Sequence, residues 1–202
     1  IYTNITFVDI AGLVKGASKG EGLGNKFLSH IREVDAIIHL VRCFDSDKIT
    51  HVNSKINPVE DLETIKTEII LSDLDIVQKK LEKGKKKLLQ EKEVKILEEK
   101  LKQLNEGKEV TFNNEFEKKF LTTLGLLSIK PKIIVCNVDE ESLATGNTFT
   151  EDVKKKYLNE KIVIICADIE DQIMGLDNDE KETFMKEIGL DKTGLNQLIK
   201  EG

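Results

Sequence analysis

The sequence contains no uninterrupted apolar run that approaches the roughly 18 residues needed to span a membrane. It also lacks the charged start, apolar middle and cleavage site that form a secretory signal. The two absences argue against a membrane partner and against export. We therefore predict a soluble, cytoplasmic protein.

Cysteine is scarce, with only Cys43, Cys136 and Cys166 in the chain. Their number is odd, and no CxxC or Cys/His spacing typical of a metal site occurs. Each cysteine lies at the end of an apolar run. We predict buried free thiols in a reducing compartment rather than metal ligands.

Excess positive charge is absent from the chain as a whole, whose net charge is -6 with a pI near 5.3. This balance excludes a protein held to nucleic acid by its overall charge, but leaves room for a local basic surface. One segment has this character, with six lysines against Glu82: Lys79, Lys80, Lys83, Lys85, Lys86 and Lys87. It is either a solvated helix end or a contact for the phosphate backbone of RNA. Since no aromatic residue is interleaved, we expect charge attraction without base recognition.

The 202 residues, 39% of them hydrophobic, are enough for one domain, or for one domain with an insertion. The chain begins with Ile1 rather than methionine, and we expect it to be part of a longer protein. Four short apolar runs without alternation predict strands buried on both faces of a parallel sheet: Ile5–Ile10, Ala36–Val41, Lys132–Val138 and Ile162–Ala167. Ligands of such sheets bind at the carboxyl ends of the strands, and we expect the functional site there.

A different pattern separates the second and third runs. Apolar residues recur at helical spacing over residues 62–81 and again over 94–104, and a third apolar stripe extends over 112–127. Gly84 lies between the first two segments. We predict an antiparallel helical hairpin, or coiled coil, inserted into the α/β domain.

Asp9 and Gly12 form a DxxG pattern after the first predicted strand. Nucleotide hydrolases use this arrangement beside a triphosphate: the carboxylate holds Mg²⁺ through water, and the glycine N–H approaches the terminal phosphate. The pattern alone is weak, because a strand-ending aspartate and a turn glycine also serve as caps.

Two further loops follow the third and fourth predicted strands. Asn137, Val138 and Glu140 belong to an NxxE pattern that stands where guanine-nucleotide proteins carry NKxD. Replacement of the final aspartate removes the reason to prefer guanine. Cys166 and Ala167 occupy the place of an SAK-type loop, in which the Ala167 N–H would face the base. Three such elements in the right order are far more specific than one.

The stretch FVDIAGLVKGASKGEGLGNKFLSHIRE, continued by DAIIHLVRCF, closely resembles the YchF/Obg-like ATPase family of Obg-related P-loop NTPases. INPVEDLETIKTEIILSDLD, NVDE and CADIEDQI are also similar, so the resemblance covers nearly the whole chain. It implies a Ras-like nucleotide-binding domain in two parts, residues 1–58 and 128–202, interrupted by a helical hairpin over 59–127. It also implies ATP, Mg²⁺, a monomer and association with the ribosome.

Some family features are missing from these 202 residues. No GxxxxGK[ST] motif occurs, and no C-terminal TGS-type domain follows Gly202, so we expect the chain to be inactive as a fragment. Leu13 stands where a Ras-like enzyme carries a water-orienting glutamine. The glycines of the following loop, Gly16, Gly20, Gly22 and Gly24, favour a segment that rearranges between nucleotide states.

Three functions remain open from sequence. The first is an ATP-hydrolysing switch that acts on the ribosome. The second is a non-catalytic module that docks on RNA or ribosome through the hairpin. The third is a GTP-binding switch of the Obg type, which Glu140 in place of aspartate disfavours.

Overall fold

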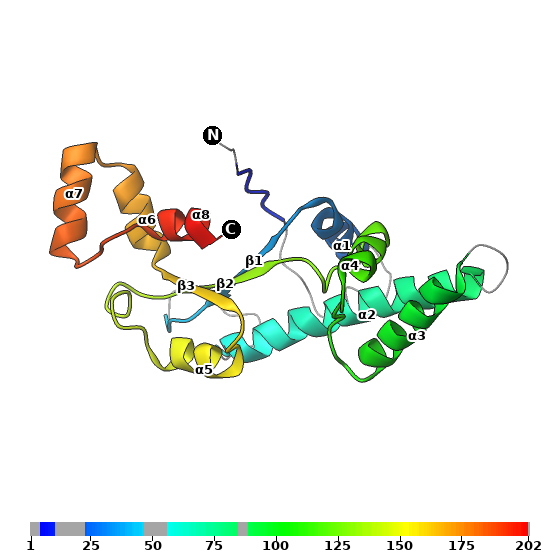
Figure 1. Cartoon of the computed structure of the whole chain (residues 1–202). Coiled ribbons are helices and arrows are strands. Elements are labelled where there is room, and N and C mark those ends of the chain that lie inside the picture. Colours follow the sequence, from blue (N-terminus) through cyan, green and yellow to red (C-terminus); the bar gives the residue numbers. More distant parts are fainter. Residues whose placement is uncertain (1–4, 11–22, 47–55, 85–88, 202) are drawn as a thin grey trace. The chain divides into compact units, whose positions relative to one another are not determined.

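The computed structural model describes residues 5–10, 23–46, 56–84 and 89–201 (Figure 1). The chain divides into two compact units. One consists of residues 1–6, 38–62 and 132–202, and the other of residues 7–37 and 63–131. Each unit therefore gathers segments that are distant in the sequence. Within the described residues, no helix is long and apolar enough to cross a membrane.

The first unit is built on a three-stranded sheet with the order β1 (Ile37–Arg42), β2 (Lys132–Asn137) and β3 (Lys161–Ile165). β2 and β3 run parallel, with Ile133 opposite Lys161 and Asn137 opposite Ile165. All four residues between the ends of β2 are buried. The continuous apolar runs therefore predicted these three strands correctly, to within one or two residues at each end.

Helices cover both faces of this sheet. On one face, Ile134 and Cys136 of β2 pack with Leu62 of α2 (Pro58–Gly84) and Val153 of α5 (Thr148–Lys156). On the other face, β2 and β3 pack against Leu198 of α8 (Gly194–Glu201). Beyond β3 the chain forms α6 (Ala167–Met174) and α7 (Asn178–Glu187), whose apolar side chains share a further cluster with Cys166. The predicted α/β architecture is confirmed.

The predicted first strand, Ile5–Ile10, is wrong. Residues 5–10 form no strand, and three of their large apolar side chains, Ile5, Phe7 and Val8, are about half exposed. An apolar run becomes a strand only when a neighbouring strand takes up its backbone hydrogen bonds. Of the described strands, none pairs with this segment, so Asp9 does not stand at the end of a strand as predicted.

The second unit contains α1 (Leu23–Glu33), most of α2, α3 (Glu91–Asn105) and α4 (Glu115–Thr123). α3 runs back beside α2, which gives the expected helical hairpin (Figure 1). Its core joins Val77 and Leu81 of α2 to Leu97 and Leu104 of α3, and α4 adds Leu121. The middle of the stripe at residues 112–127 is thus a helix, α4, that packs on the hairpin.

The Asp73 carboxylate and the Lys130 ammonium hold separate segments of this unit together by hydrogen bonds. Asp73 of α2 is fully buried and accepts hydrogen bonds from the Leu127 and Ser128 backbone N–H groups and from the Ser128 hydroxyl. Burial raises the pKa of this carboxyl, although the three donors oppose the shift. The Lys130 ammonium donates to the Arg32 and Val34 carbonyl oxygens at the end of α1. The segment that leads into β2 is therefore tied to both α1 and α2.

Candidate functional site

Asp9 is exposed and lies in the irregular segment 5–10, in the part that belongs to the second unit. No described residue forms a hydrogen bond or an ion pair with its carboxylate. The role of Asp9 in holding Mg²⁺ through water stays a prediction from the DxxG pattern. Gly12, Leu13 and most of the glycine-rich loop lie outside the described residues.

The first unit brings together the loops that follow β2 and β3. Asn137 ends β2, and its side-chain Oδ1 accepts a hydrogen bond of 2.9 Å from the Ala167 N–H at the start of α6. The Val138 N–H donates to the Ile165 carbonyl oxygen at 2.8 Å. The two loops are therefore joined directly at the carboxyl ends of neighbouring parallel strands, which is where ligands of such sheets bind.

The roles of the predicted base-binding residues differ in detail from the expectation. The Ala167 N–H, expected to face the base, is occupied by Asn137. Val138 is buried in the sheet core, so its side chain is a packing residue and only its backbone remains for a ligand. Asn137 keeps a free side-chain NH₂ within the described part of the chain, and this group is a hydrogen-bond donor.

Glu140 is exposed in the loop after β2. Its carboxylate accepts a long hydrogen bond, 3.4 Å, from the Gln172 side-chain amide on α6. This further contact, between the β2–α5 loop and α6, was not predicted, because nothing in the sequence spacing relates Gln172 to Glu140. One of the two carboxylate oxygens of Glu140 remains available.

A helix cap, a hydrogen bond and a tight turn hold the rest of the β2–α5 loop. Asn147 caps α5, and its side-chain NH₂ donates to the Cys43 carbonyl oxygen at 2.7 Å, directly after β1. Gly146, before the cap, has a φ of 75°, where a side chain would be strained and would also meet Thr150 Oγ1 at 2.6 Å. The turn at Gly146 therefore requires glycine.

The three cysteines are free and buried, as predicted. Cys43 and Cys136 share a hydrogen bond across neighbouring strands, and this bond raises the pKa of Cys43 while it lowers the pKa of Cys136. Burial raises the pKa of Cys166, which precedes α6 as its N-cap residue. The Cys166 thiol is therefore neutral near pH 7 and offers a ligand no charge. Among the described residues, no group of three His, Cys, Asp or Glu side chains is placed to hold a metal ion.

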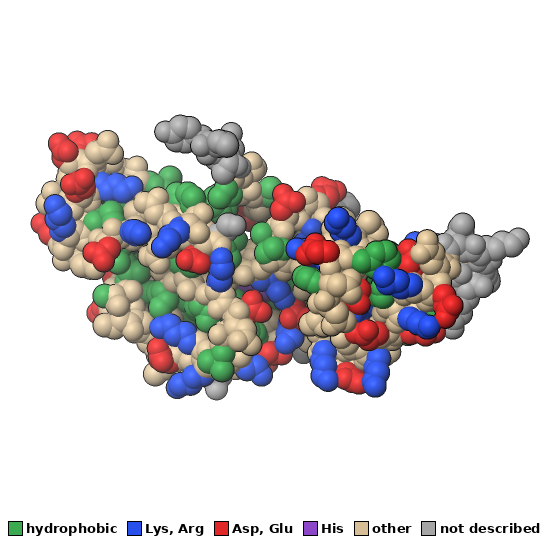
Figure 2. Space-filling view, in the orientation of Figure 1, with side chains coloured by type: hydrophobic (Ala, Val, Ile, Leu, Met, Phe, Trp, Pro, Cys, Tyr) green, Lys and Arg blue, Asp and Glu red, His purple; other side chains and the backbone are tan. Residues whose placement is uncertain are grey.

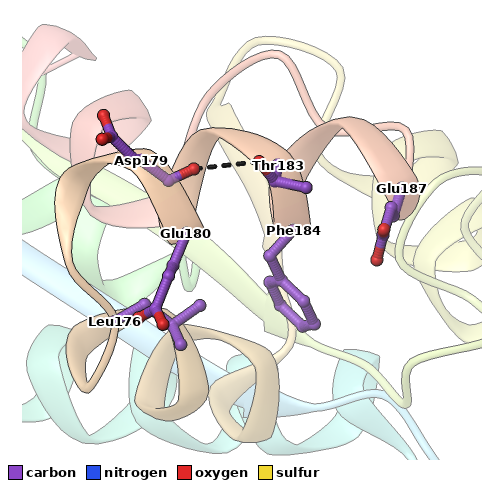
Figure 3. A pocket seen from close by; sticks show the side chains of 6 residues that line it. All are labelled: Leu176, Asp179, Glu180, Thr183, Phe184 and Glu187. Atoms are coloured by element: carbon purple, nitrogen blue, oxygen red, sulfur yellow. Dashed lines mark hydrogen bonds between the residues drawn. The ribbon is translucent and has the colours of Figure 1, made fainter.

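A surface hollow of about 460 Å³ lies between the end of α6 and α7 (Figure 3). Its six lining residues are Leu176, Asp179, Glu180, Thr183, Phe184 and Glu187. None of the predicted site residues is among them. Three carboxylates at its edge would repel a triphosphate, so this hollow is unsuited to a nucleotide phosphate tail.

Comparison with known proteins gives the family. Residues 2–137 match the family model described as 50S ribosome-binding GTPase. The chain belongs to the 50S ribosome-binding GTPase family. The YchF/Obg-like resemblance expected from the sequence is confirmed by curated relatives and by a solved structure.

The family members most relevant here carry the name YchF. The chain is 43% identical to the "Ribosome-binding ATPase YchF" of Bacillus subtilis, over 99% of the chain and 58% of that protein. It is 44% identical to the protein of the same name from Escherichia coli O157:H7, over 99% of the chain and 57% of that protein. The structure titled "Structure of the Schizosaccharomyces pombe YchF GTPase" matches with a TM-score of 0.81 and 30% identity, over 94% of this chain and 55% of that one. The chain thus spans less than two thirds of the length of these relatives.

Proposed function

We propose that the protein to which this chain belongs is a Mg²⁺-dependent, ATP-hydrolysing switch that associates with the ribosome. The observation that carries the proposal is the Asn137–Ala167 hydrogen bond. It joins the NxxE loop and the SAK-like loop into one surface at the carboxyl ends of β2 and β3. A purine base is the ligand that these two loops bind in related nucleotide-binding folds.

The chemistry of the donors and acceptors fits adenine. The free NH₂ of Asn137 is a donor for the base nitrogen N7. The Glu140 carboxylate is an acceptor for the exocyclic amino group that adenine carries at N6, whereas guanine offers an oxygen at that edge. The names of the relatives divide between ATPase and GTPase. On these physical grounds we favour ATP, with a GTP-binding switch of the Obg type as the alternative.

Asp9 is the residue we assign to Mg²⁺, which it would hold through water. Its exposed carboxylate has no competing partner among the described residues, which suits an ion that keeps several waters and few protein ligands. Bound Mg²⁺ would supply charge neutralisation at the phosphates. The backbone N–H of Gly12 is assigned to the terminal phosphate on the DxxG pattern alone.

The hydrolysis proposal is tested by Asp9→Asn in the full-length protein. We expect steady-state Mg²⁺-ATP hydrolysis to fall at least about tenfold, because the variant loses the charge that holds the ion. Asp35→Asn is the matched control, since Asp35 is an exposed aspartate of the same unit that follows α1. Equal turnover in the wild type and Asp9→Asn, with unchanged thermal unfolding, would remove Asp9 from the mechanism.

The ribosome is the partner we propose, with the lysine segment of the hairpin as its contact with rRNA. Lys79, Lys80 and Lys83 lie on the last turns of α2, whereas Lys85, Lys86 and Lys87 fall outside the described residues. Lys79 pairs with Asp75 at 2.7 Å, but both side chains are exposed, so the pair is weak and leaves the ammonium accessible. Cytoplasmic location, a monomeric state, a coiled-coil hairpin and the domain division 1–58, 59–127 and 128–202 belong to the same proposal.

Charge reversal tests the contact. Lys85→Glu, Lys86→Glu and Lys87→Glu together are expected to weaken ribosome co-sedimentation at low salt. The matched control reverses Lys154, Lys155 and Lys156, three consecutive lysines in the last turn of α5. If both triple variants sediment like the wild type, the lysine segment is only a solvated helix end. If the wild type sediments with ribosomes but hydrolyses no nucleotide, the protein is a non-catalytic binding module.

A further inference from the structure

The second unit exposes two phenylalanine rings, and each lies under a lysine ammonium. Phe116 of α4 is 42% exposed, and the Lys92 Nζ stands 4.1 Å from the centre of its ring. Phe112, just before α4, is 40% exposed, with the Lys118 Nζ at 5.6 Å. Each ring is exposed enough to offer part of a face for stacking, and the neighbouring ammonium brings positive charge to the same place. We call Phe112, Phe116, Lys92 and Lys118 the aromatic platform.

The platform lies at the basic end of the hairpin. Lys92 is the second residue of α3, so it follows the lysine segment after a few residues. The contact between Lys92 and Phe116 brings the start of α4 to this end of α3. The lysine segment contains no aromatic residue of its own, and the rings come from α4 and from the residues just before it. The expectation of charge attraction without base contact was based on the segment alone and did not include α4.

The exposed charges of the platform are mainly positive. Within the described residues, no carboxylate pairs with Lys92 or Lys119, and Glu115 reaches Lys118 only at 4.0 Å. Glu117, the other acid of α4, is buried and holds the Lys100 ammonium and the Asn113 backbone. Figure 2 shows blue and red side chains interspersed over the visible face, so the platform is a local feature rather than part of a broad field of one sign.

A partner for this surface has to offer a flat apolar face and an anionic group a few ångströms away. An unpaired nucleotide offers both. Its base displaces the lysine ammonium and stacks on the aromatic ring, and its phosphate pairs with the displaced ammonium. Bases in a duplex are already stacked on one another and are closed to such contacts. An acidic protein segment would satisfy the lysines but would leave the rings without a planar partner.

We propose that the aromatic platform binds single-stranded RNA by stacking unpaired bases on Phe112 and Phe116. The choice of RNA rests on the proposed association with the ribosome. The assignment adds base contacts to the phosphate contacts expected from the lysine segment. It predicts a preference for single-stranded over double-stranded RNA, with little dependence on sequence because every base has an aromatic face.

The experiment uses the full-length protein and a fluorescein-labelled 12-nucleotide oligouridylate, with binding followed by anisotropy at several salt concentrations. The double variant Phe112→Leu/Phe116→Leu keeps the apolar volume and removes both aromatic faces. We expect about tenfold weaker binding with an unchanged salt dependence, since the phosphate contacts remain. Lys92→Met is expected to weaken binding and to reduce the salt slope by about one unit.

Two matched controls accompany these variants. Phe120→Leu removes a ring from the same helix, but Phe120 packs against the hairpin core. Lys95→Met removes a charge from α3, but Lys95 pairs with Glu91 and covers no ring. Both are expected to bind oligouridylate within about twofold of the wild type, because neither contributes a ring face or a free ammonium to the platform.

Three results would overturn the proposal. They are wild-type affinity of the double leucine variant for oligouridylate, an equal loss of affinity for a 12-base-pair RNA duplex, and loss of ribosome co-sedimentation without any loss of RNA binding. The last result would assign the surface to a ribosomal protein. Mg²⁺-ATP hydrolysis by the same variants is measured in parallel and should be unchanged. If the wild type does not hydrolyse ATP, the proposed function is contradicted, but the RNA-binding proposal is not.

Discussion

Glu117 shows how one carboxylate organises the start of α4. It accepts hydrogen bonds from the Asn113 backbone N–H at 2.9 Å and from the Asn113 and Asn114 side chains. It also stands 3.4 Å from the ammonium of Lys100, which is fully buried. The bond from the Asn113 backbone, together with Lys100, holds the pKa of Glu117 below its usual value. These contacts fix the helix that carries Phe116.

We predict that Glu117→Gln destabilises the protein by about 2 kcal/mol at pH 7, because Lys100 keeps only the carboxylate of Glu99. The folded protein binds this proton less readily than the unfolded chain does. The contribution of Glu117 is therefore complete above the unfolded pKa near 4.5 and is lost as the pH falls through the lower folded value. Urea unfolding of both proteins across pH 7 to 3 measures it. A stability difference that does not shrink on acidification would contradict this assignment.

Contacts of this kind are the part that the sequence did not predict. The pairs Lys92–Phe116, Glu140–Gln172 and Asn147–Cys43 join positions that are far apart in the chain. Periodicity and motif spacing report only on neighbours along the sequence. Asp9, Asn137, Glu140 and Ala167 were predicted as site residues because their motifs have a fixed order along the chain, and their roles stay predictions. The occupation of the Ala167 N–H by Asn137 needed coordinates.

Among the elements, α8 packs closely against β3 at its first residue. A Cβ added at Gly194 would lie 2.4 Å from the Ile165 Cγ2 and 3.0 Å from the Glu170 carboxylate. Glu170 in turn accepts hydrogen bonds from the Gly194 and Leu195 N–H groups at the start of α8. The first residue of α8 therefore has to be glycine for the helix to reach the sheet.

Gly194→Ala is expected to lower the free energy of unfolding by about 1–3 kcal/mol, since the side chain forces α8 away from β3. Gly175→Ala is the control: its nearest neighbour is a carbonyl oxygen at 3.5 Å, and its φ of -83° suits alanine. Denaturant midpoints of the two variants measure the difference. Equal midpoints would mean that α8 does not need this close approach.

Asn137 has two proposed roles: its side-chain oxygen holds the Ala167 N–H, and its side-chain NH₂ donates to the base. Two substitutions separate them. Asn137→Asp keeps an oxygen that accepts from the Ala167 N–H, whereas Asn137→Ala removes it. We expect hydrogen exchange of the Ala167 amide to accelerate about tenfold or more in Asn137→Ala and to stay near the wild-type rate in Asn137→Asp. Nucleotide affinity should fall in both, because both lose the free NH₂. Unchanged Ala167 exchange in Asn137→Ala would exclude the positioning role.

Most elements followed from the sequence, and the one failure has a physical reason. The strands β1, β2 and β3 and the hairpin helices were predicted from continuous apolarity and helical periodicity. The run Ile5–Ile10 has the same composition, but no described strand pairs with it and its side chains are half exposed. Composition indicates that a segment is able to form a strand, but not that a partner is present.

For the whole molecule, family membership establishes the fold, and the loops after β2 and β3 are proposed to select the nucleotide base. Asp9 belongs to the unit that contains the hairpin, and Asn137 belongs to the unit that contains the sheet. Asp9 stays the predicted carboxylate for Mg²⁺, and the loops after β2 and β3 are the proposed donors and acceptors for a base. We propose that this base is adenine.

A competition titration shows which purine base the protein prefers. Mg²⁺-ATP and Mg²⁺-GTP are each used to displace one fluorescent nucleotide from the full-length protein. We expect ATP to displace it at a concentration at least about tenfold lower than GTP, because the Glu140 carboxylate would accept from the adenine amino group and would be repelled by the guanine oxygen. GTP that competes as well as ATP, or better, would contradict it.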